Sequence, residues 1–187
     1  GLITTTSGDG TVLGYDIRTE GDKIRSRIGY MPEYDALDPD LSAIDQVRYA
    51  GELLGMNPAH ATRRAHEVLQ YVGLKDQRYR KIETYSTGMK QAAKLACALV
   101  HDPDVLICDE PTNGLDQRAR EFMLQTLRRT VSEGNRSVLM SSHVMDDVQE
   151  VCDRIVMIHK GRIVVQRRIE DLARQIEREI EISVWGG

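Results

Sequence analysis

A short apolar run that ends in two adjacent acids, Val105–Cys108 followed by Asp109 and Glu110, most constrains how this chain can fold. So short a run, bounded by turn-forming residues, is typical of a buried strand, which carries the two carboxylates to its C-terminal end. In an open α/β sheet, ligands bind beyond the C-terminal ends of the strands. We therefore expect Asp109 to face a metal ion and Glu110 to face the water that attacks a phosphate.

The phosphate-binding loop that usually accompanies such a strand is missing from these 187 residues. That loop has the pattern G-x-x-x-x-G-K-[ST], and no glycine of the chain is directly followed by lysine. Gly8-Asp-Gly10 resembles the start of a nucleotide fingerprint, but a third glycine at the right spacing is absent, so we expect a simple turn there. The sequence thus contains most of a phosphate-cleaving site without its phosphate cradle.

The composition is that of an ordinary globular domain, with 41% hydrophobic residues, 29% charged residues and a net charge of −4. Without a strong basic bias, no nucleic-acid partner is expected. The three cysteines, Cys97, Cys108 and Cys152, lie far apart and form no C-x-x-C pair, which predicts reduced, mostly buried thiols in a cytoplasmic protein. No apolar stretch approaches the about 20 residues needed to cross a bilayer, so a membrane role requires a partner.

The spacing of apolar residues divides the chain into strand and helix segments. A strand or hairpin is expected at Thr11–Leu13, and a second strand over Ile24–Met31. Residues 41–100 have helical spacing, with helix starts at Ser42, at Asn57-Pro58 and near Ser86 or Thr87; the second helix ends at Gly73. We therefore expect a helical segment between two strand-containing parts.

After residue 100 short strands return, separated by helices. The expected strands are Val105–Cys108, Val138–Met140, Ile155–Ile158 and Ile163–Val165. A helix capped by Asp116 and ending near Gly134 separates the first two, and an amphipathic packing helix is expected from Ile169 to Ile180. Alternating strands and helices imply a mostly parallel sheet covered on both faces.

Four further segments become informative through their order along the chain. Singly, a helix cap at Ser86, an acidic strand end or a lone His143 has an ordinary structural explanation. Together, the Ser86-Thr-Gly-Met-Lys-Gln91 helix start, the acids, Asn113-Gly-Leu-Asp116 and His143 resemble the nucleotide-binding domain of ATP-binding-cassette (ABC) proteins. Met31-Pro-Glu33 lies where that family places its Q-loop.

The resemblance implies an α/β fold, with a P-loop NTPase-like, mostly parallel sheet as core and an inserted helical subdomain. Residues 1–40 and 101–168 would form the catalytic core portions, and residues 41–100 the helical subdomain with the signature motif. Residues 169–187 would begin a C-terminal extension. The whole chain, 1–187, would then be part of one ABC ATPase domain.

The resemblance also implies the roles of the site residues, with ATP and Mg²⁺ as cofactors. Asp109 would hold Mg²⁺, Glu110 would act as general base, and His143 would connect the γ-phosphate with the loop of an opposite subunit. The start of the signature helix offers backbone N–H groups to an anion. The residues expected to contact the nucleotide are Ser86, Thr87, Gly88, Gln91 and Asp116. In this family that surface caps the ATP of a second domain in a head-to-tail dimer.

Three departures from the family pattern concern Thr87, Met89 and Glu33. Glycine is commoner at the first position and glutamine is frequent at the second, whereas Gly88, at which a side chain would block a phosphate, is kept. Glu33 replaces the Q-loop glutamine, and a carboxylate there can bind Mg²⁺ or orient water. We hypothesise that Glu33 makes activity more dependent on Mg²⁺, which fails if Glu33→Gln leaves that dependence unchanged; a tolerated variant without kinetic meaning is the alternative.

The resemblance places the missing phosphate-binding loop before the start of the chain. Gly1–Ile3 lies where, in this family, the helix that follows that loop ends. We expect the nucleotide-stacking aromatic residue, the first strands and the Gly-Lys loop upstream of Gly1. Without that loop the chain alone should bind ATP very weakly and not hydrolyse it. An incomplete sequence is favoured over a natural regulatory fragment.

The resulting interpretation is the ATPase component of an ABC transporter at the cytoplasmic face of the membrane. Residues 85–91 with Met31–Glu33 are most similar to the branch that exports drugs, lipids or polysaccharides. Its expected partner is a multi-span permease whose short cytoplasmic helix docks near Glu33 and the helices of 41–85.

Three alternatives remain open. A DNA-maintenance ATPase would separate Glu33 and Ser86 by long coiled coils or extra domains, whereas in this chain the two residues are only 53 positions apart. A ribosome-associated ABC protein would usually have two cassettes and basic linkers. A catalytically dead interaction module would have no chemical need for Asp109, Glu110 and His143 together.

Overall fold

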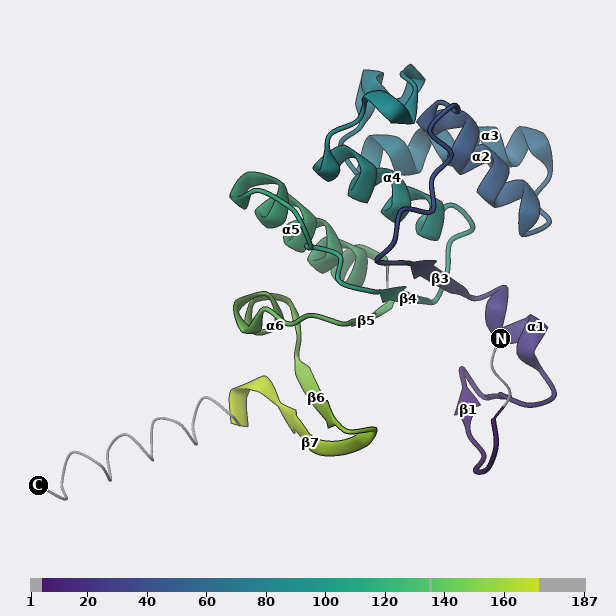
Figure 1. Ribbon diagram of the computed structural model, residues 1–187. Helices are drawn as coiled ribbons and strands as arrows, with labels where there is room; N and C mark the ends of the chain where they lie inside the picture. The colour runs from purple at the N-terminus through teal and green to yellow at the C-terminus, as the bar shows by residue number, and fades with distance from the viewer. Residues whose placement is uncertain (1–4, 135, 172–187) are drawn as a thin grey trace, which may run out of the picture. The chain divides into compact units, whose positions relative to one another are not determined.

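The computed structural model describes residues 5–134 and 136–171. The chain forms two compact units, Gly1–Ser141 and Ser142–Gly187, which are described separately (Figure 1). The proposed helical subdomain lies wholly within the first unit, and its boundaries at residues 41 and 100 stay a prediction.

A parallel sheet of β3 (Ile28–Met31), β4 (Val105–Cys108) and β5 (Ser137–Met140) forms the centre of the first unit, with β4 in the middle. The register aligns Met31 with Cys108 and Cys108 with Met140, so the three strands end at one edge. This arrangement confirms the α/β fold class and the strands predicted at 105–108 and 138–140.

One face of this sheet is buried under helices. Helix α4 (Thr87–Leu99) packs on β3, and α5 (Gln117–Gly134) contacts β5. Gly29 permits the close approach, because an added Cβ would lie 2.1 Å from the carbonyl oxygen of Ala98 in α4. On the other face Tyr30 and Leu139 are 51% and 60% exposed, so the described residues of this unit cover one face rather than the expected two.

The N-terminal part differs from the prediction in two places. The strand expected over Ile24–Met31 begins only at Ile28, because Ile24 is the buried residue of a short helix, α1 (Gly21–Arg25). The polar residues 25–27 separate Ile24 from the apolar residues of the strand. Strands β1 (Thr11–Val12) and β2 (Tyr15–Asp16) form the expected hairpin, but Leu13 lies in its turn with φ 53°.

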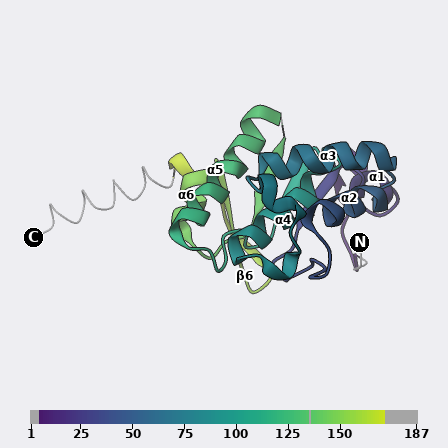
Figure 2. The same ribbon diagram turned by 90° about the horizontal axis from the view of Figure 1, so that it is seen from above.

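Three helices, α2 (Ala43–Leu53), α3 (Pro58–Tyr71) and α4, pack against one another (Figures 1 and 2). Each begins at a predicted cap, where a side-chain oxygen satisfies a backbone N–H that the helix leaves unpaired. Ser42 accepts from the N–H of Asp45, Asn57 from Ala59 and Ser86 from Met89. The 3₁₀ turns η1 (Lys75–Tyr79) and η2 (Ile82–Thr84) connect α3 to α4.

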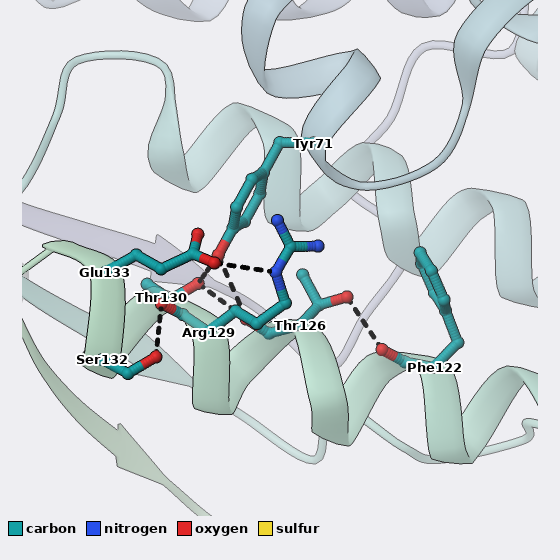
Figure 3. Close-up of polar contacts among 7 residues, drawn as sticks. All are labelled: Tyr71, Phe122, Thr126, Arg129, Thr130, Ser132 and Glu133. Atoms are coloured by element: carbon teal, nitrogen blue, oxygen red, sulfur yellow. Dashed lines mark hydrogen bonds and ion pairs between the residues drawn. The ribbon is translucent and has the colours of Figure 1, made fainter.

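A buried polar contact ties α3 to α5 (Figure 3). The Tyr71 hydroxyl forms a hydrogen bond of 3.2 Å with the Thr130 hydroxyl and one of 3.4 Å with the Thr126 carbonyl oxygen. The guanidinium of Arg129 lies 4.7 Å from the centre of the Tyr71 ring. Helical spacing predicted both helices, but nothing in their sequences identified these partners.

The second unit contains α6 (Met145–Val151) and an antiparallel hairpin of β6 (Arg154–His159) and β7 (Arg162–Arg168). Both strands were predicted, and they pair antiparallel with each other. Lys160 and Gly161 both have positive φ, 48° and 74°, which gives the two-residue turn that hairpins favour. The amphipathic helix expected from Ile169 is helical to residue 171, and its remainder lies outside the described residues.

Candidate functional site

The two acids lie at the C-terminal edge of the parallel sheet. The N–H of Asp109 donates to the Met31 carbonyl oxygen at 2.9 Å, which continues the strand pairing by one residue. The chain then turns sharply, and Glu110 takes a positive φ of 46°. Both side chains are half-buried. The edge position predicted from the apolar run is therefore where the structure places both carboxylates.

Ser141, the first residue after β5, holds this acidic turn in place. Its hydroxyl donates to Oδ1 of Asp109 at 2.6 Å, and its oxygen accepts from the N–H of Glu110 at 2.9 Å. One side chain thus fixes both the Asp109 carboxylate and the backbone of Glu110. Sequence reasoning missed Ser141, although a serine that ends the neighbouring parallel strand was an available signal.

Glu33 follows β3 directly and forms a polar contact with the loop after the acids. The side-chain amide of Asn113 donates to Oε1 of Glu33 at 3.1 Å. The amide of Gln91, from α4, donates to the Asn113 carbonyl oxygen at 3.4 Å. Three segments far apart in sequence therefore meet beside a small polar cavity, and Thr87 also lines it.

Gln91 is 5% exposed, and its Oε1 has no hydrogen-bond partner within the described part of the chain. Its side-chain amide contacts the loop at Asn113. A direct contact of Gln91 with nucleotide stays a prediction.

The signature segment forms the start of α4, as predicted. The Ser86 oxygen accepts from the N–H of Met89 at 3.3 Å, and Ser86 and Thr87 are exposed. At Gly88 an added Cβ would lie 3.1 Å from Cβ of Ala119 in α5. Close packing of α4 on α5 is therefore one physical reason for glycine at this position, separate from the expected approach of a phosphate.

Asp116 has a clear structural role. Its Oδ1 accepts from the N–H of Ala119 at 2.8 Å, which caps α5 as predicted. An acid also suits the positive end of the helix dipole. Contact of Asp116 with nucleotide stays a prediction.

His143 belongs to the second unit and is exposed on the segment that leads into α6. In the same segment the N–H of Val144 donates to the Ser142 hydroxyl at 3.0 Å. The γ-phosphate contact of His143 stays a prediction.

Of the three cysteines, which were expected to be mostly buried, Cys108 is buried and Cys97 and Cys152 are half-buried. Cys97, Cys108 and Cys152 form no disulfide in the structure described for residues 5–134 and 136–171. Burial raises the pKa of Cys97 and of Cys108 to about 12, so these thiols stay protonated and unreactive near neutral pH.

Within the same ranges, no helix has the length and apolar character that a membrane span requires.

Comparison with known proteins identifies the family. The sequence model described as ABC transporter matches residues 1–113. The linearmycin resistance ATP-binding protein LnrL of Bacillus subtilis is 38% identical over 188 residues, covering 100% of this chain and 60% of LnrL. The daunorubicin/doxorubicin resistance ATP-binding protein DrrA of Streptomyces peucetius is 34% identical, covering 88% of this chain and 50% of DrrA. The chain therefore spans at most 60% of these two relatives.

Solved structures give the same answer for the fold. A structure described as an ATP binding subunit of an ABC transporter superposes with a TM-score of 0.78 at 28% identity, covering 95% of this chain and 73% of that one. A second ATP-binding cassette, bound to ADP and phosphate, has the same TM-score at 22% identity and supports the fold alone. The family model over residues 1–113 and relatives of 34–38% identity show that the chain belongs to the ABC transporter family, among its ATP-binding subunits.

Proposed function

We propose that the complete protein hydrolyses ATP to drive export through a membrane-spanning partner. The observation that carries this proposal is the acidic turn at the sheet edge, in which Ser141 holds Asp109 and Glu110 together. Family membership supports ATP hydrolysis in general. The coupling to export is inferred from LnrL and DrrA, whose names describe resistance to linearmycin and to daunorubicin/doxorubicin.

The acidic edge suits water activation. Glu110 would accept a proton from the attacking water, while the backbone of that residue stays fixed by Ser141. A rigid backbone matters here, because phosphoryl transfer depends mainly on positioning and on charge stabilisation. His143 is proposed, from the family resemblance, to connect the γ-phosphate with the loop of an opposite subunit.

The acidic residues also fit a magnesium ion bound together with nucleotide. Asp109 and Glu33 offer carboxylate oxygens, the ligand type that Mg²⁺ prefers. No cluster of three or more His, Cys, Asp or Glu side chains able to hold a metal occurs within residues 5–134 and 136–171. Since Mg²⁺ usually takes one or two carboxylates and completes its shell with phosphate oxygens and water, two carboxylates suffice. When bound, the ion would neutralise developing charge on the phosphates.

The exposed start of α4 suits binding of a second domain. Ser86, Thr87 and the N–H groups of the first turn lie at the positive end of a helix of 13 residues. We propose that they cap the ATP held by a second nucleotide-binding domain in a head-to-tail dimer.

Exposed apolar side chains occur next to Glu33 in the sequence and on α2. Tyr34, Tyr49 and Leu53 are 68%, 51% and 68% exposed, and the latter two belong to α2. Apolar side chains at these positions are consistent with the proposed docking of a short cytoplasmic helix of the permease. The protein would then act at the cytoplasmic face of the membrane, and the permease would select the transported compound.

The experiment that tests this proposal is an equilibrium titration of ATP with Mg²⁺ against two proteins. One is the chain of 187 residues, and the other is the longer protein that includes the expected Gly-Lys loop. We expect tight binding and hydrolysis only for the longer protein, with hydrolysis stimulated by the co-expressed permease. Tight binding by the short chain would refute the assignment of the phosphate site. Hydrolysis stimulated by DNA or by ribosomes, and not by the permease, would favour the alternative ATPase classes.

A further inference from the structure

Helix α4 contains a buried lysine whose role is not explained by the site described above. Lys94 is 5% exposed, and its Nζ donates to the carbonyl oxygens of three consecutive residues. The distances are 2.9 Å to Pro32, 2.9 Å to Glu33 and 3.3 Å to Tyr34. The three acceptors match the three N–H donors of a charged ammonium group.

The backbone of residues 32–34 is therefore held by one buried cation. Removing an ammonium group from water is costly unless its donors are satisfied, and here carbonyl oxygens satisfy all three. Burial lowers the pKa of Lys94 from its usual value, while the neighbouring Asp35 and Glu33 carboxylates oppose that shift. One turn earlier on α4, Lys90 forms an ion pair of 2.9 Å with Asp35.

The side chain of Glu33, in the same loop, is held by the segment that follows the acidic turn. Asn113 donates to the Glu33 carboxylate at 3.1 Å, and Gln91 donates to the Asn113 carbonyl oxygen at 3.4 Å. Gln91 and Lys94 lie on the same helix, so α4 determines the position of Glu33 by two routes. One route runs through the loop backbone, and the other runs through the side chain.

We propose that Lys94 is a positioning residue that sets the Glu33 carboxylate for ATP hydrolysis by fixing the loop backbone at residues 32–34. The inference rests on the proposed function, and it deepens that function by assigning a task to a lysine outside the family motif. Because Ser86 caps α4, the same helix links the position of Glu33 to the surface offered to the second domain.

A lysine with a purely structural role would behave differently. Its loss would lower the stability of the domain, and its effect on kcat would be the same with glutamate or glutamine at position 33. A positioning role predicts that the kinetic effect depends on the Glu33 carboxylate, because only that group is displaced when the loop relaxes. The two roles are therefore separated by a double-mutant cycle.

The first test is the ammonium group itself, in the complete protein labelled with ¹⁵N-lysine. Three hydrogen bonds in a buried place slow the exchange of the Nζ protons with water. We expect a slowly exchanging ammonium resonance that disappears in Lys94→Arg and persists in Lys81→Met, since Lys81 is exposed. If Lys94 gives no such resonance, the geometry and the inference are both refuted, whatever the ATPase result.

The second test is ATP hydrolysis by the complete protein as a function of Mg²⁺. A misplaced group near the reacting atoms costs roughly 10- to 100-fold in rate. We expect Lys94→Met to lower kcat by roughly tenfold and to raise the Mg²⁺ concentration needed for half of the maximal rate, with partial rescue in Lys94→Arg. Lys81→Met is the matched control, because it removes an exposed lysine from the same helical region.

The Glu33→Gln background decides between the two roles. There we expect Lys94→Met to change kcat less than about twofold. If Lys94→Met lowers kcat by the same factor in the parent and in the Glu33→Gln protein, positioning through Glu33 is refuted. It is also refuted if Lys94→Met has the same kcat and the same Mg²⁺ dependence as Lys81→Met. A parent protein that hydrolyses no ATP refutes the proposed function instead, and the catalytic part of this inference falls with it.

Discussion

Gly88 in α4 packs closely against Ala119 in α5, so a larger residue at position 88 should lower stability. In Gly88→Ala the new Cβ would lie 3.1 Å from Cβ of Ala119. Apolar carbon atoms normally touch at about 3.5–4.0 Å, so the two helices must move apart by roughly half an ångström. We therefore expect Gly88→Ala to destabilise the first unit.

The size of this effect follows from two opposing contributions. Overpacking a close contact costs about 1–3 kcal/mol. Replacing glycine by alanine in a helix returns at most about 1 kcal/mol. The expected net loss in the free energy of unfolding is about 1 kcal/mol. In the exchanged pair, Gly88→Ala with Ala119→Gly, the clash disappears. The gain in helix propensity at position 88 roughly offsets the loss at position 119.

Urea unfolding followed by circular dichroism measures both variants against the parent. We expect a lower midpoint for Gly88→Ala and a midpoint near that of the parent for the exchanged pair. Unchanged or increased stability of Gly88→Ala would refute the packing argument. A failure of Ala119→Gly to restore stability would refute it equally.

The exchanged pair then tests the proposed approach of a phosphate to Gly88 in the complete protein. The packing is restored there, but the Cβ at position 88 remains. We expect ATP hydrolysis at least about tenfold below the parent, because the added methyl group misplaces the phosphate. Hydrolysis at the parental rate would show that glycine serves packing alone.

Three further predictions concern other parts of the chain. Tyr71→Phe removes the hydroxyl between α3 and α5, but Thr130 keeps its bond of 2.9 Å to the Thr126 carbonyl oxygen, so unfolding by urea should show a loss of only about 1 kcal/mol; a loss above about 3 kcal/mol would contradict this. Ser141→Ala should lower the ATPase kcat of the complete protein by about tenfold, because Asp109 and Glu110 lose a shared partner; the neighbouring Ser142→Ala is the control, and equal effects would refute the assigned role. The buried thiols of Cys97 and Cys108 have pKa values raised from 9.0 to about 12, so the stability they contribute is present below pH 9 and is lost as the pH rises from about 9 to 12. Unfolding by urea over that range, compared with Cys108→Ala, measures the loss, and an identical pH dependence in the two proteins would contradict it.

Local chemistry explains which parts of the fold were predictable. Ser42, Asn57 and Asp116 were identified as helix starts because a side-chain oxygen satisfies a backbone N–H within three residues of its own position. The acidic edge was predictable for a similar reason, since a short apolar run with charged ends has few alternatives to a buried strand. Each of these predictions depends on contacts between sequence neighbours.

Contacts between distant segments explain what the sequence could not show. The place of Ser141 at a strand end was visible in the sequence, but its contact with Asp109 was not. The contact of Lys94 with the loop at Glu33 likewise appears only in the fold. Ile24 was misplaced because an apolar residue fits a strand and a short amphipathic helix equally well. The direction of the β6–β7 pairing followed from the turn at Lys160, which the apolar pattern of the strands does not encode.

Glu110→Gln in the complete protein tests the proposed role of Glu110 as the group that accepts a proton from the attacking water. Glutamine keeps the size of the side chain and removes its ability to take a proton from water. We expect ATP to bind within about threefold of the parental affinity, while turnover falls by at least about 100-fold. Turnover at the parental rate would contradict the claim, because the proton would then be accepted by a group other than the carboxylate that β4 delivers to the sheet edge.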